Sequence, residues 1–430
     1  MAPIRHNPTL SDDLISEILV RVPVKSLLRF QSVCKSWLSL IKHSAFVRSQ
    51  LLYSSTTQTD QTLIISRYRN DEENKFLLLR VDSREIEVDL KYPYSRDEFT
   101  HVPLCTLVGS ANGIVCIAVD FINLKVGIYL WNPATRQSKA IPTFRDVHHE
   151  SLGFGYDPID DDYKVVRIVM PPSFSEVYSA NTNVWRNVPD PIDRPLAADF
   201  DVCVNGFLCG IGEYGMMAFD LNKEVLNCGI KLPVFSAEAS VDDNENDDDY
   251  YGEAEGDDND DNDYGEGDHD NDYNDDDDYG DGDDGPGYYE TRVTESNARI
   301  IEYSKSIAVL VLRDNGLNYN KRVKMWTLDD DACLCGGGVE ASWTPVFSID
   351  LGIPAYIVHG FFSNKDVQIL LENVDVWISC NIDKKEAKII PLSIDMAKEL
   401  YNRHIYKYTE SLVSLEGFGQ VNWNADGDDN

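Results

Sequence analysis

One strand–turn–strand unit recurs along the chain and constrains its fold more than any other feature. The unit has an apolar strand, a polar turn rich in Asn, Asp, Thr or Lys, and a second strand that usually ends in Pro. Regular copies occupy residues 127–142, 176–189, 217–233 and 376–391, and a less regular copy opens at Lys324 and resumes at Ser342. Apolar runs rich in aromatic and β-branched residues, bounded by turn-forming residues, are typical of strands, so each copy predicts a β-hairpin.

The spacing of the copies predicts an array of small sheets. The distance from one copy to the next, measured between the second residues of their first strands, is 49, 41, 107 and 52 residues. The distance of 107 residues includes an acidic run. Periods of about 40–50 residues with several strands each are typical of β-propellers, and the residues after 50 would hold about six to eight blades. A kelch-like, all-β propeller is therefore the predicted fold, and a β-sandwich of hairpin meanders is the alternative.

Tryptophans and Asn-Gly pairs occur at set places in these units. Asn-Gly is a turn-forming pair, so it predicts tight connections between strands rather than catalytic loops. The repeated tryptophans occupy strand positions, and we interpret them as core residues rather than as a cage for a ligand. They are Trp131, Trp185, Trp326, Trp343 and Trp377.

The acidic run carries most of the chain's charge. The formal net charge is -36, and the 24 Asp and Glu residues between Asp242 and Asp284 are accompanied by no Lys or Arg. A run with few aliphatic residues cannot bury enough surface to fold, which predicts a disordered insertion over 242–287. Either the insertion is merely tolerated, or it attracts a basic partner electrostatically. Nucleic acid and anionic membranes attract basic surfaces, so neither is expected as a partner.

The cysteines and apolar runs indicate the compartment. Nine cysteines at irregular spacing predict reduced thiols, as in the cytoplasm or nucleus. The first ten residues lack the apolar core of a signal peptide. The longest apolar runs, 307–312 and 114–119, are too short to span a bilayer. The sequence therefore predicts a soluble cytoplasmic protein that could also enter the nucleus.

Motifs for catalysis or metal binding are not found in the sequence. It contains neither a phosphate-binding Gly-x-x-x-x-Gly-Lys nor a nucleophile elbow. Cys333 and Cys335 would supply only half of a zinc site, because no second pair follows at zinc spacing. We expect no catalytic residue, no metal and no cofactor. A propeller enzyme is the least favoured alternative.

Residues 10–46 have a different, helical pattern. Leu14, Ile15, Ile18, Leu19 and Val22 fall on one arc of about 140° of a helix. Ser11, followed by two Asp, predicts a helix cap, and Pro23 predicts the end of that helix. A second apolar series at three- and four-residue steps continues to Ile41.

A unit of about 40 residues rarely builds a sufficient core of its own. Burial of eight large side chains against a partner would contribute about 12–24 kcal/mol, compared with an association cost of about 4–15 kcal/mol. Periodicity alone leaves two alternatives open: the helices pack onto the β domain, or another protein's surface completes them.

The run from Leu10 to Trp37, LSDDLISEILVRVPVKSLLRFQSVCKSW, resembles a plant F-box. Ser11 stands where that family usually has Pro. The resemblance implies binding to a Skp-family adaptor, which joins a cullin scaffold and a RING subunit. It also implies that the following residues form or support the contact: Leu10, Leu14, Ile18, Leu19, Pro23, Leu28, Val33, Cys34 and Trp37.

The resemblance extends into the β domain. The segments 109–116, 130–136, 153–158 and 162–167 resemble the F-box-associated domain of plants, and the nearest subgroup resembles S-locus F-box and S-locus F-box-like proteins. The implied organisation is α+β, with a small three-helix F-box over 9–50 and a propeller-like domain over 51–241 and 288–415. A flexible tail would occupy 416–430.

This organisation implies the substrate-recognition subunit of a Skp–cullin–F-box ubiquitin ligase, which is itself non-catalytic. The β domain would bind the client. The client-binding residues are unknown, but the S-locus resemblance implies a basic, secreted-type ribonuclease of self-incompatibility as one candidate. The alternative is an interaction scaffold that binds the adaptor without promoting ubiquitination.

Overall fold

Four helices open the described part of the chain, in a computed structural model. The helices are α1 (Asp12–Val20), α2 (Val24–Phe30), α3 (Lys35–Lys42) and α4 (Ser44–Thr57). As predicted, Ser11 caps α1, because its side chain accepts a hydrogen bond from the backbone N–H of Leu14. Pro23 separates α1 from α2 and accepts the first backbone hydrogen bonds of α2. The second apolar series forms two helices, since the chain turns between residues 31 and 34.

The structure describes residues 11–57, 61–69, 72–81, 83, 86–88, 90, 104–120, 126–142, 150–169, 174–188, 200–212, 215–233, 298–314, 321–336, 338–351, 358–363, 366–371, 376–381, 383–384, 386–391 and 405–416. The predicted acidic insertion and the tail after 416 lie outside these residues, and so does Leu10.

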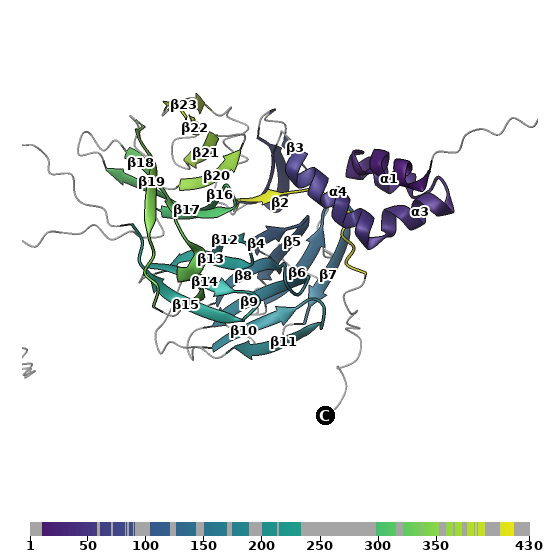
Figure 1. Cartoon of the computed structure of the whole chain (residues 1–430), viewed down its shortest axis with the longest axis horizontal. Helices are drawn as coiled ribbons and strands as arrows, with labels where there is room; N and C mark the ends of the chain where they lie inside the picture. Colours follow the sequence, from purple (N-terminus) through teal and green to yellow (C-terminus); the bar gives the residue numbers. More distant parts are fainter. Residues whose placement is uncertain are drawn as a thin grey trace, which may run out of the picture. The chain divides into compact units, whose positions relative to one another are not determined.

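The strands form six four-stranded antiparallel sheets within the described residues, which makes the β domain a propeller (Figure 1). From the innermost strand outward, the first sheet contains β24 (Ile405–Tyr408), β1 (Thr62–Arg69), β2 (Glu72–Arg80) and β3 (Ile86–Val88). The second contains β4 (Leu104–Ala111), β5 (Ile114–Asp120), β6 (Val126–Asn132) and β7 (Gln137–Ile141). The third contains β8 (Glu150–Asp157), β9 (Asp162–Val169), β10 (Phe174–Ser179) and β11 (Val184–Val188).

The remaining three sheets continue this order. The fourth contains β12 (Phe200–Val204), β13 (Phe207–Gly212), β14 (Gly215–Asp220) and β15 (Val225–Ile230). The fifth contains β16 (Ala298–Tyr303), β17 (Ser306–Asp314), β18 (Lys321–Leu328) and β19 (Trp343–Asp350), with a 3₁₀ turn, η2 (Asp331–Cys335), between the last two strands. The sixth contains β20 (Val358–Ser363), β21 (Asp366–Leu371), β22 (Val376–Asn381) and β23 (Glu386–Pro391).

The repeated sequence units correspond to one part of each sheet. They form the hairpins β6–β7, β10–β11, β14–β15, β18–β19 and β22–β23, which are the third and fourth strands of five consecutive sheets. The first sheet is the exception, because it is assembled from both ends of the β domain: β24 pairs antiparallel with β1. This pairing closes the propeller with residues more than 300 positions apart.

Apolar side chains pack between neighbouring sheets rather than within one sheet. One cluster joins the first and second sheets, for example Phe76 with Ile117, and another joins the fifth and sixth, for example Leu310 with Ile369. The innermost strands contact one another in the order β24, β4, β8, β12, β16 and β20. Close packing of these strands uses glycine: a Cβ on Gly109 would lie 2.9 Å from the carbonyl oxygen of Phe154.

The tryptophans only partly follow the prediction of a core role. Trp131 is buried, but Trp185, Trp326 and Trp343 are half-buried. Trp185, on an outer strand, donates an indole hydrogen bond to the carbonyl of Pro142 at the edge of the preceding sheet, over 2.6 Å. The indole N–H of Trp343 likewise donates to the backbone carbonyl oxygen of Lys231, 2.9 Å away. These two therefore tie the outer edges of neighbouring sheets.

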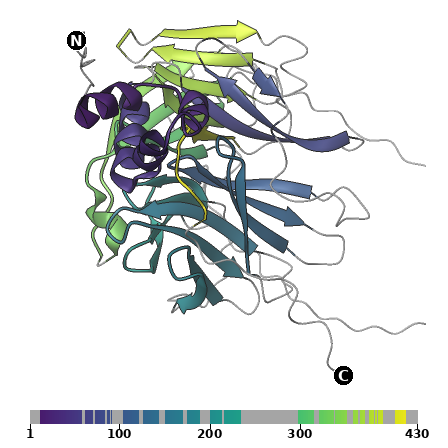
Figure 2. The ribbon, with the colours of Figure 1, turned by 90° about the vertical axis from the view of Figure 1, so that its right-hand side faces the viewer.

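The helices lie together at one side of the sheets, as the two views in Figures 1 and 2 agree. In the described residues, we find no helix with the length and apolar composition that crossing a membrane requires.

Candidate partner-binding surface

The interior of the helical module is a small apolar cluster. Leu19, Val24, Leu27, Ile41 and Phe46 are buried at its centre. The surrounding helical residues that pack on it include Ile15, Val20, Val22, Leu28, Phe30, Trp37, Leu40 and Val47. Burial of a large aliphatic side chain contributes about 1.5–3 kcal/mol. This cluster therefore holds the four helices in one arrangement.

The residues expected to contact an adaptor fall into two groups. Leu19, Leu28 and Trp37 belong to the interior cluster, where Trp37 packs against the ring of Phe30. The other described members reach the surface. They are Leu14, Ile18, Pro23, Val33 and Cys34. Of the first group, Leu19 is buried and can only support a contact, whereas Leu28 and Trp37 are half-buried. The second group is exposed enough to make a contact.

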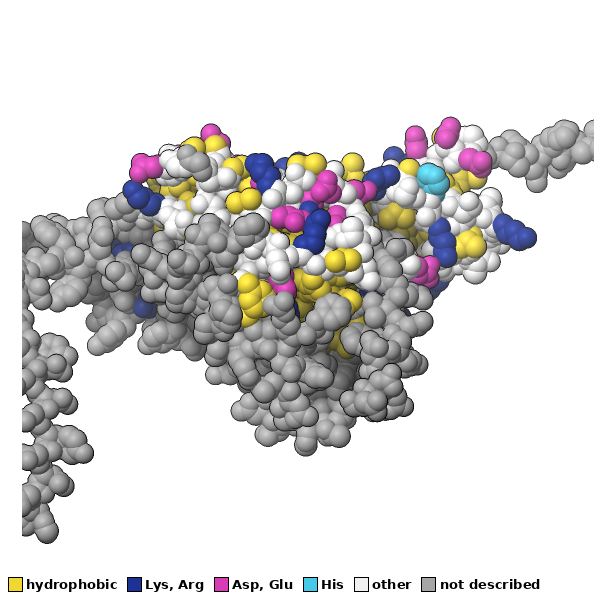
Figure 3. Space-filling model, turned by 90° about the horizontal axis from the view of Figure 1, so that it is seen from below, with side chains coloured by type: hydrophobic (Ala, Val, Ile, Leu, Met, Phe, Trp, Pro, Cys, Tyr) yellow, Lys and Arg dark blue, Asp and Glu magenta, His cyan; other side chains and the backbone are white. Residues whose placement is uncertain are grey.

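Three aliphatic side chains of the second group are unusually exposed for their type. Leu14 is 49% exposed, Ile18 52% and Val33 60%. Leu38 of α3 is also exposed, although its helical periodicity gave no reason to select it. We call Leu14, Ile18, Val33 and Leu38 the exposed aliphatic set. In Figure 3 hydrophobic side chains reach the surface of the helical region between Lys and Arg side chains. Exposed apolar groups rimmed by polar ones are typical of protein interaction sites.

The other side of the helical module is covered by the propeller. Leu412, which follows the last strand, is buried in the interior cluster of the helices, and Ala134 from the β6–β7 turn packs against that cluster. Arg48 of α4 pairs with Asp161 in the β8–β9 turn at 3.2 Å. The first alternative left open by the sequence is thus met in part, because the propeller covers one side of the helices. The exposed aliphatic set remains on the surface, so completion by another protein stays a prediction.

Asn132 fixes the segment that carries Leu412. Its fully buried side-chain amide donates to the carbonyls of Ser411 and Val413, at 3.2 and 2.8 Å. Its side-chain oxygen accepts from the backbone N–H groups of Ala134 and Thr135, at 3.0 and 3.2 Å. Sequence reasoning noted Asn132 only as part of the family-like segment 130–136. It could not predict this role, because Ser411 and Val413 are about 280 residues away in the sequence.

Cys34 is an exposed thiol at the start of α3. Its sulfur lies 3.1 Å from the hydroxyl of Ser36, and this hydrogen bond lowers the pKa of the thiol below its ordinary value. By contrast, burial raises the pKa of the Cys116 thiol far above the ordinary range. All nine cysteines are free. Within the described ranges no three His, Cys, Asp or Glu side chains gather as metal ligands would.

The comparisons with known proteins agree with this two-part structure. Residues 8–49 match the F-box domain, and residues 51–246 match the F-box associated beta propeller domain. The Arabidopsis thaliana F-box protein At2g21930 is 32% identical over 234 residues, covering 49% of this chain and 58% of that protein. The Arabidopsis F-box/kelch-repeat protein At3g23880 is 31% identical over 243 residues, covering 51% and 64%. The chain thus spans less than two thirds of the length of either relative.

Among solved structures, a chain of the nidogen/laminin complex aligns over 82% of this chain and 99% of its own length, with a TM-score of 0.39 at 8% identity. The two matched ranges meet at residue 50, within α4, so α1, α2, α3 and the beginning of α4 fall in the first match. The chain is therefore similar to an F-box domain over residues 8–49 and to an F-box associated beta propeller domain over residues 51–246, and it resembles F-box proteins of Arabidopsis.

Proposed function

We propose that this protein is the non-catalytic substrate receptor of a Skp–cullin–F-box ubiquitin ligase. The observation that carries the proposal is the exposed aliphatic set on an F-box whose opposite side is already covered by the propeller. A Skp-family adaptor would bury Leu14, Ile18 and Val33, together with Pro23 and Cys34. Leu19, Leu28 and Trp37 would hold these residues in place from below. Leu10, which precedes Ser11 in the sequence, would extend the contact.

The propeller would bind the client at the end away from the F-box. Strands alternate in direction, so the β6–β7 and β8–β9 turns, which meet the helices, lie at the same end of the propeller. The adaptor and the cullin–RING subunits would then lie on that side, and a client on the other. Ubiquitin transfer would be promoted by proximity, because the receptor holds client lysines near the charged conjugating enzyme.

The proposal extends to the client's charge and to the compartment. The net charge of -36 favours a basic client, whose association would be accelerated electrostatically and slowed by salt. A basic ribonuclease, as the resemblance to S-locus F-box proteins implies, is one client of this class. We place the protein in the cytoplasm, with access to the nucleus, where ubiquitin ligases of this kind act and cysteines stay reduced.

The test uses substitutions at the surface, which spare the interior cluster. The full chain with both Leu14→Asp and Ile18→Asp should lose at least tenfold in affinity for a purified Skp-family adaptor, measured by calorimetry. Ile159→Asp is the matched control, because Ile159 is 75% exposed but lies in the β8–β9 turn. Adaptor binding that survives the double substitution would contradict the proposed surface.

A second measurement separates a receptor from a scaffold. Deletion of residues 9–46 should lengthen the half-life of proteins that bind the propeller in cells. A scaffold without a role in ubiquitination would leave the turnover of every bound protein unchanged.

A further inference from the structure

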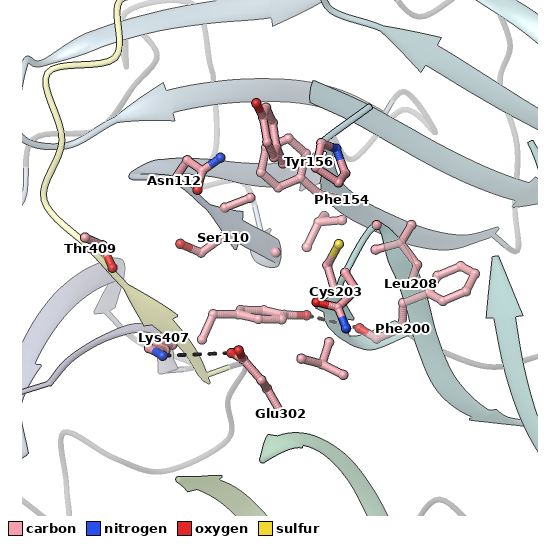
Figure 4. Close-up of a pocket in the computed structure, with 18 of the residues that line it drawn as sticks. Ser110, Asn112, Phe154, Tyr156, Phe200, Cys203, Leu208, Glu302, Lys407 and Thr409 are labelled. Carbon is pink, nitrogen blue, oxygen red and sulfur yellow. Dashed lines mark hydrogen bonds and ion pairs between the residues drawn. The ribbon is translucent and has the colours of Figure 1, made fainter. Parts of the chain in front are cut away.

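A pocket of about 400 Å³ opens at the centre of the propeller. Its wall is contributed by the innermost strands of five successive sheets, through Ser110 of β4, Tyr156 of β8, Cys203 of β12, Glu302 of β16 and Lys407 of β24 (Figure 4). Ser55, near the end of α4, also lines it. This volume lies within the range of small-molecule sites, which is about 300–1,000 Å³.

Two of the lining residues are charged, and they have opposite signs. The Glu302 carboxylate and the Lys407 ammonium lie 3.8 Å apart, and their side chains are 40% and 47% exposed. This separation is longer than a hydrogen bond. A partly exposed ion pair of this kind contributes about 0–1 kcal/mol, so both groups can exchange partners at little cost.

The rest of the wall offers apolar surface mainly through half-buried side chains. Tyr156, Val202 and Tyr406 line the pocket beside Cys203. The other apolar lining residues, Phe154, Phe200 and Leu208, are at most 2% exposed and lie behind the wall (Figure 4). Burial raises the pKa of the Cys203 thiol to about 11, so this sulfur is neutral near pH 7 and acts as an apolar group. The Tyr156 hydroxyl is engaged with Asp161 at 2.5 Å, which leaves its ring for contact.

We propose that this pocket binds a small zwitterion with an apolar side chain, of the class of a free hydrophobic α-amino acid. Its ammonium would pair with Glu302 and its carboxylate with Lys407, while the side chain would rest against Tyr156, Val202 and Tyr406. A ligand with both charges matches the wall, because each charge gains a partner. A ligand with one charge would leave the opposite wall residue unmatched. The inference does not depend on the adaptor or on the client.

The test is calorimetric titration of the full chain with L-phenylalanine and L-leucine as probes. Saturable one-to-one binding of at least one probe is expected. N-acetyl-L-phenylalaninamide, which has the same side chain but no charge, should bind at least tenfold more weakly. Equal binding of the capped probe, or no binding of either amino acid at millimolar concentration, would overturn the proposal.

Substitutions then locate the site. Glu302→Gln and Lys407→Met should each weaken probe binding at least tenfold without changing the circular dichroism spectrum. Glu340→Gln is the matched control, because Glu340 forms an exposed ion pair with Lys231 that is remote from the pocket lining. If Glu302→Gln and Glu340→Gln bind the probe equally, the probe does not occupy this pocket and the proposal fails.

Discussion

The side-chain amide of Asn132 donates a hydrogen bond to the carbonyl oxygen of Val413, 2.8 Å away. Asn132 ends the third strand of one sheet, whereas Val413 belongs to the segment that follows the last strand and carries Leu412 into the core of the F-box. Closure of the propeller and attachment of the F-box therefore depend on the same short segment. The two parts of the chain should behave as one unit in unfolding experiments.

The substitution Asn132→Ala tests this coupling. It removes four hydrogen bonds from a fully buried site, so we expect a loss of about 2–4 kcal/mol in the free energy of unfolding. Amide hydrogen exchange should also rise in α2 and α3, because Leu412 is released. Asn181→Ala, at an exposed turn position, serves as control and should change stability by less than about 0.5 kcal/mol. Unchanged exchange in the helices would refute the coupling.

Gly113 provides a second test of the same segment. Its φ is +81°, and a Cβ there would lie 2.2 Å from the Ser411 hydroxyl oxygen and 2.6 Å from the Thr409 carbonyl oxygen. Gly336 has a similar φ of +78° but no atom within 4 Å of the added Cβ. Gly113→Ala should therefore lower the melting temperature clearly more than Gly336→Ala, since both carry the backbone strain and only the first carries the clash. Equal decreases in melting temperature for the two variants would mean that the segment around Thr409 and Ser411 moves aside without an energetic cost.

Lys164 is a buried cation that pairs with a carboxylate of its own sheet and donates to the backbone of the fourth sheet. Its ammonium lies 3.0 Å from the Asp157 carboxylate and 2.6 Å from the carbonyl oxygen of Leu221. Lys164→Met should cost about 3–5 kcal/mol of stability, because the buried Asp157 loses its counter-charge. Lys231→Met removes an exposed ion pair of the same length and should cost less than about 1 kcal/mol. Similar costs in urea unfolding would contradict this role of Lys164.

The same pair predicts how stability depends on pH. Burial raises the pKa of Asp157, but hydrogen bonds from Lys164, Ile159 and Asn222 outweigh it, so the pKa is lowered overall. Burial lowers the pKa of Lys164, but Asp157 and Glu224 outweigh it and the pKa is raised. A carboxyl with a lowered pKa stabilises the fold above its unfolded pKa, and this contribution is lost as pH falls through its folded pKa. An ammonium with a raised pKa stabilises below its unfolded pKa, and this contribution is lost as pH rises through its folded pKa.

The pair therefore contributes its full share of the free energy of unfolding between the pKa values of the unfolded chain, near 3.8 for Asp157 and 10.5 for Lys164. This contribution declines below the first pH and above the second. Lys164→Met should flatten both declines in unfolding experiments run across this range. If the variant is less stable by the same amount at every pH, the Asp157–Lys164 pair is not the source of the pH dependence.

Cys34 gives a chemical report on the proposed adaptor surface. Its exposure and lowered pKa should make it react with iodoacetamide before the buried Cys116, as mass spectrometry of peptides can follow. Addition of a Skp-family adaptor should slow the reaction of Cys34. The exposed Cys335, which lies in η2 of the propeller, is the internal control and should keep its rate. Slowing of both thiols alike would indicate a general effect rather than contact at Cys34.

The local elements follow from short-range features of the amino-acid sequence. The start of α1 at Ser11, its end before Pro23 and the recurring hairpins follow from capping, proline and turn chemistry, which act over a few residues. The Asn112-Gly113 and Asn205-Gly206 turns adopt positive φ, as such pairs favour. Periodicity also identified the apolar faces of the helices, although it placed Leu14 and Leu19 together, of which one is exposed and one buried.

Which apolar residues stay exposed, and what covers the others, depends on contacts between distant parts of the chain. Leu412 completes the F-box core from a position more than 350 residues after the end of α4, and β24 joins β1 across about 340 residues. The half-buried Trp185 and Trp343 bridge sheets through hydrogen bonds to partners more than 40 residues away. The central pocket likewise combines Glu302 with Lys407, which share no local pattern. The physical reason is that burial and pairing depend on distances in space, which closure of the propeller sets and which short-range sequence rules do not encode.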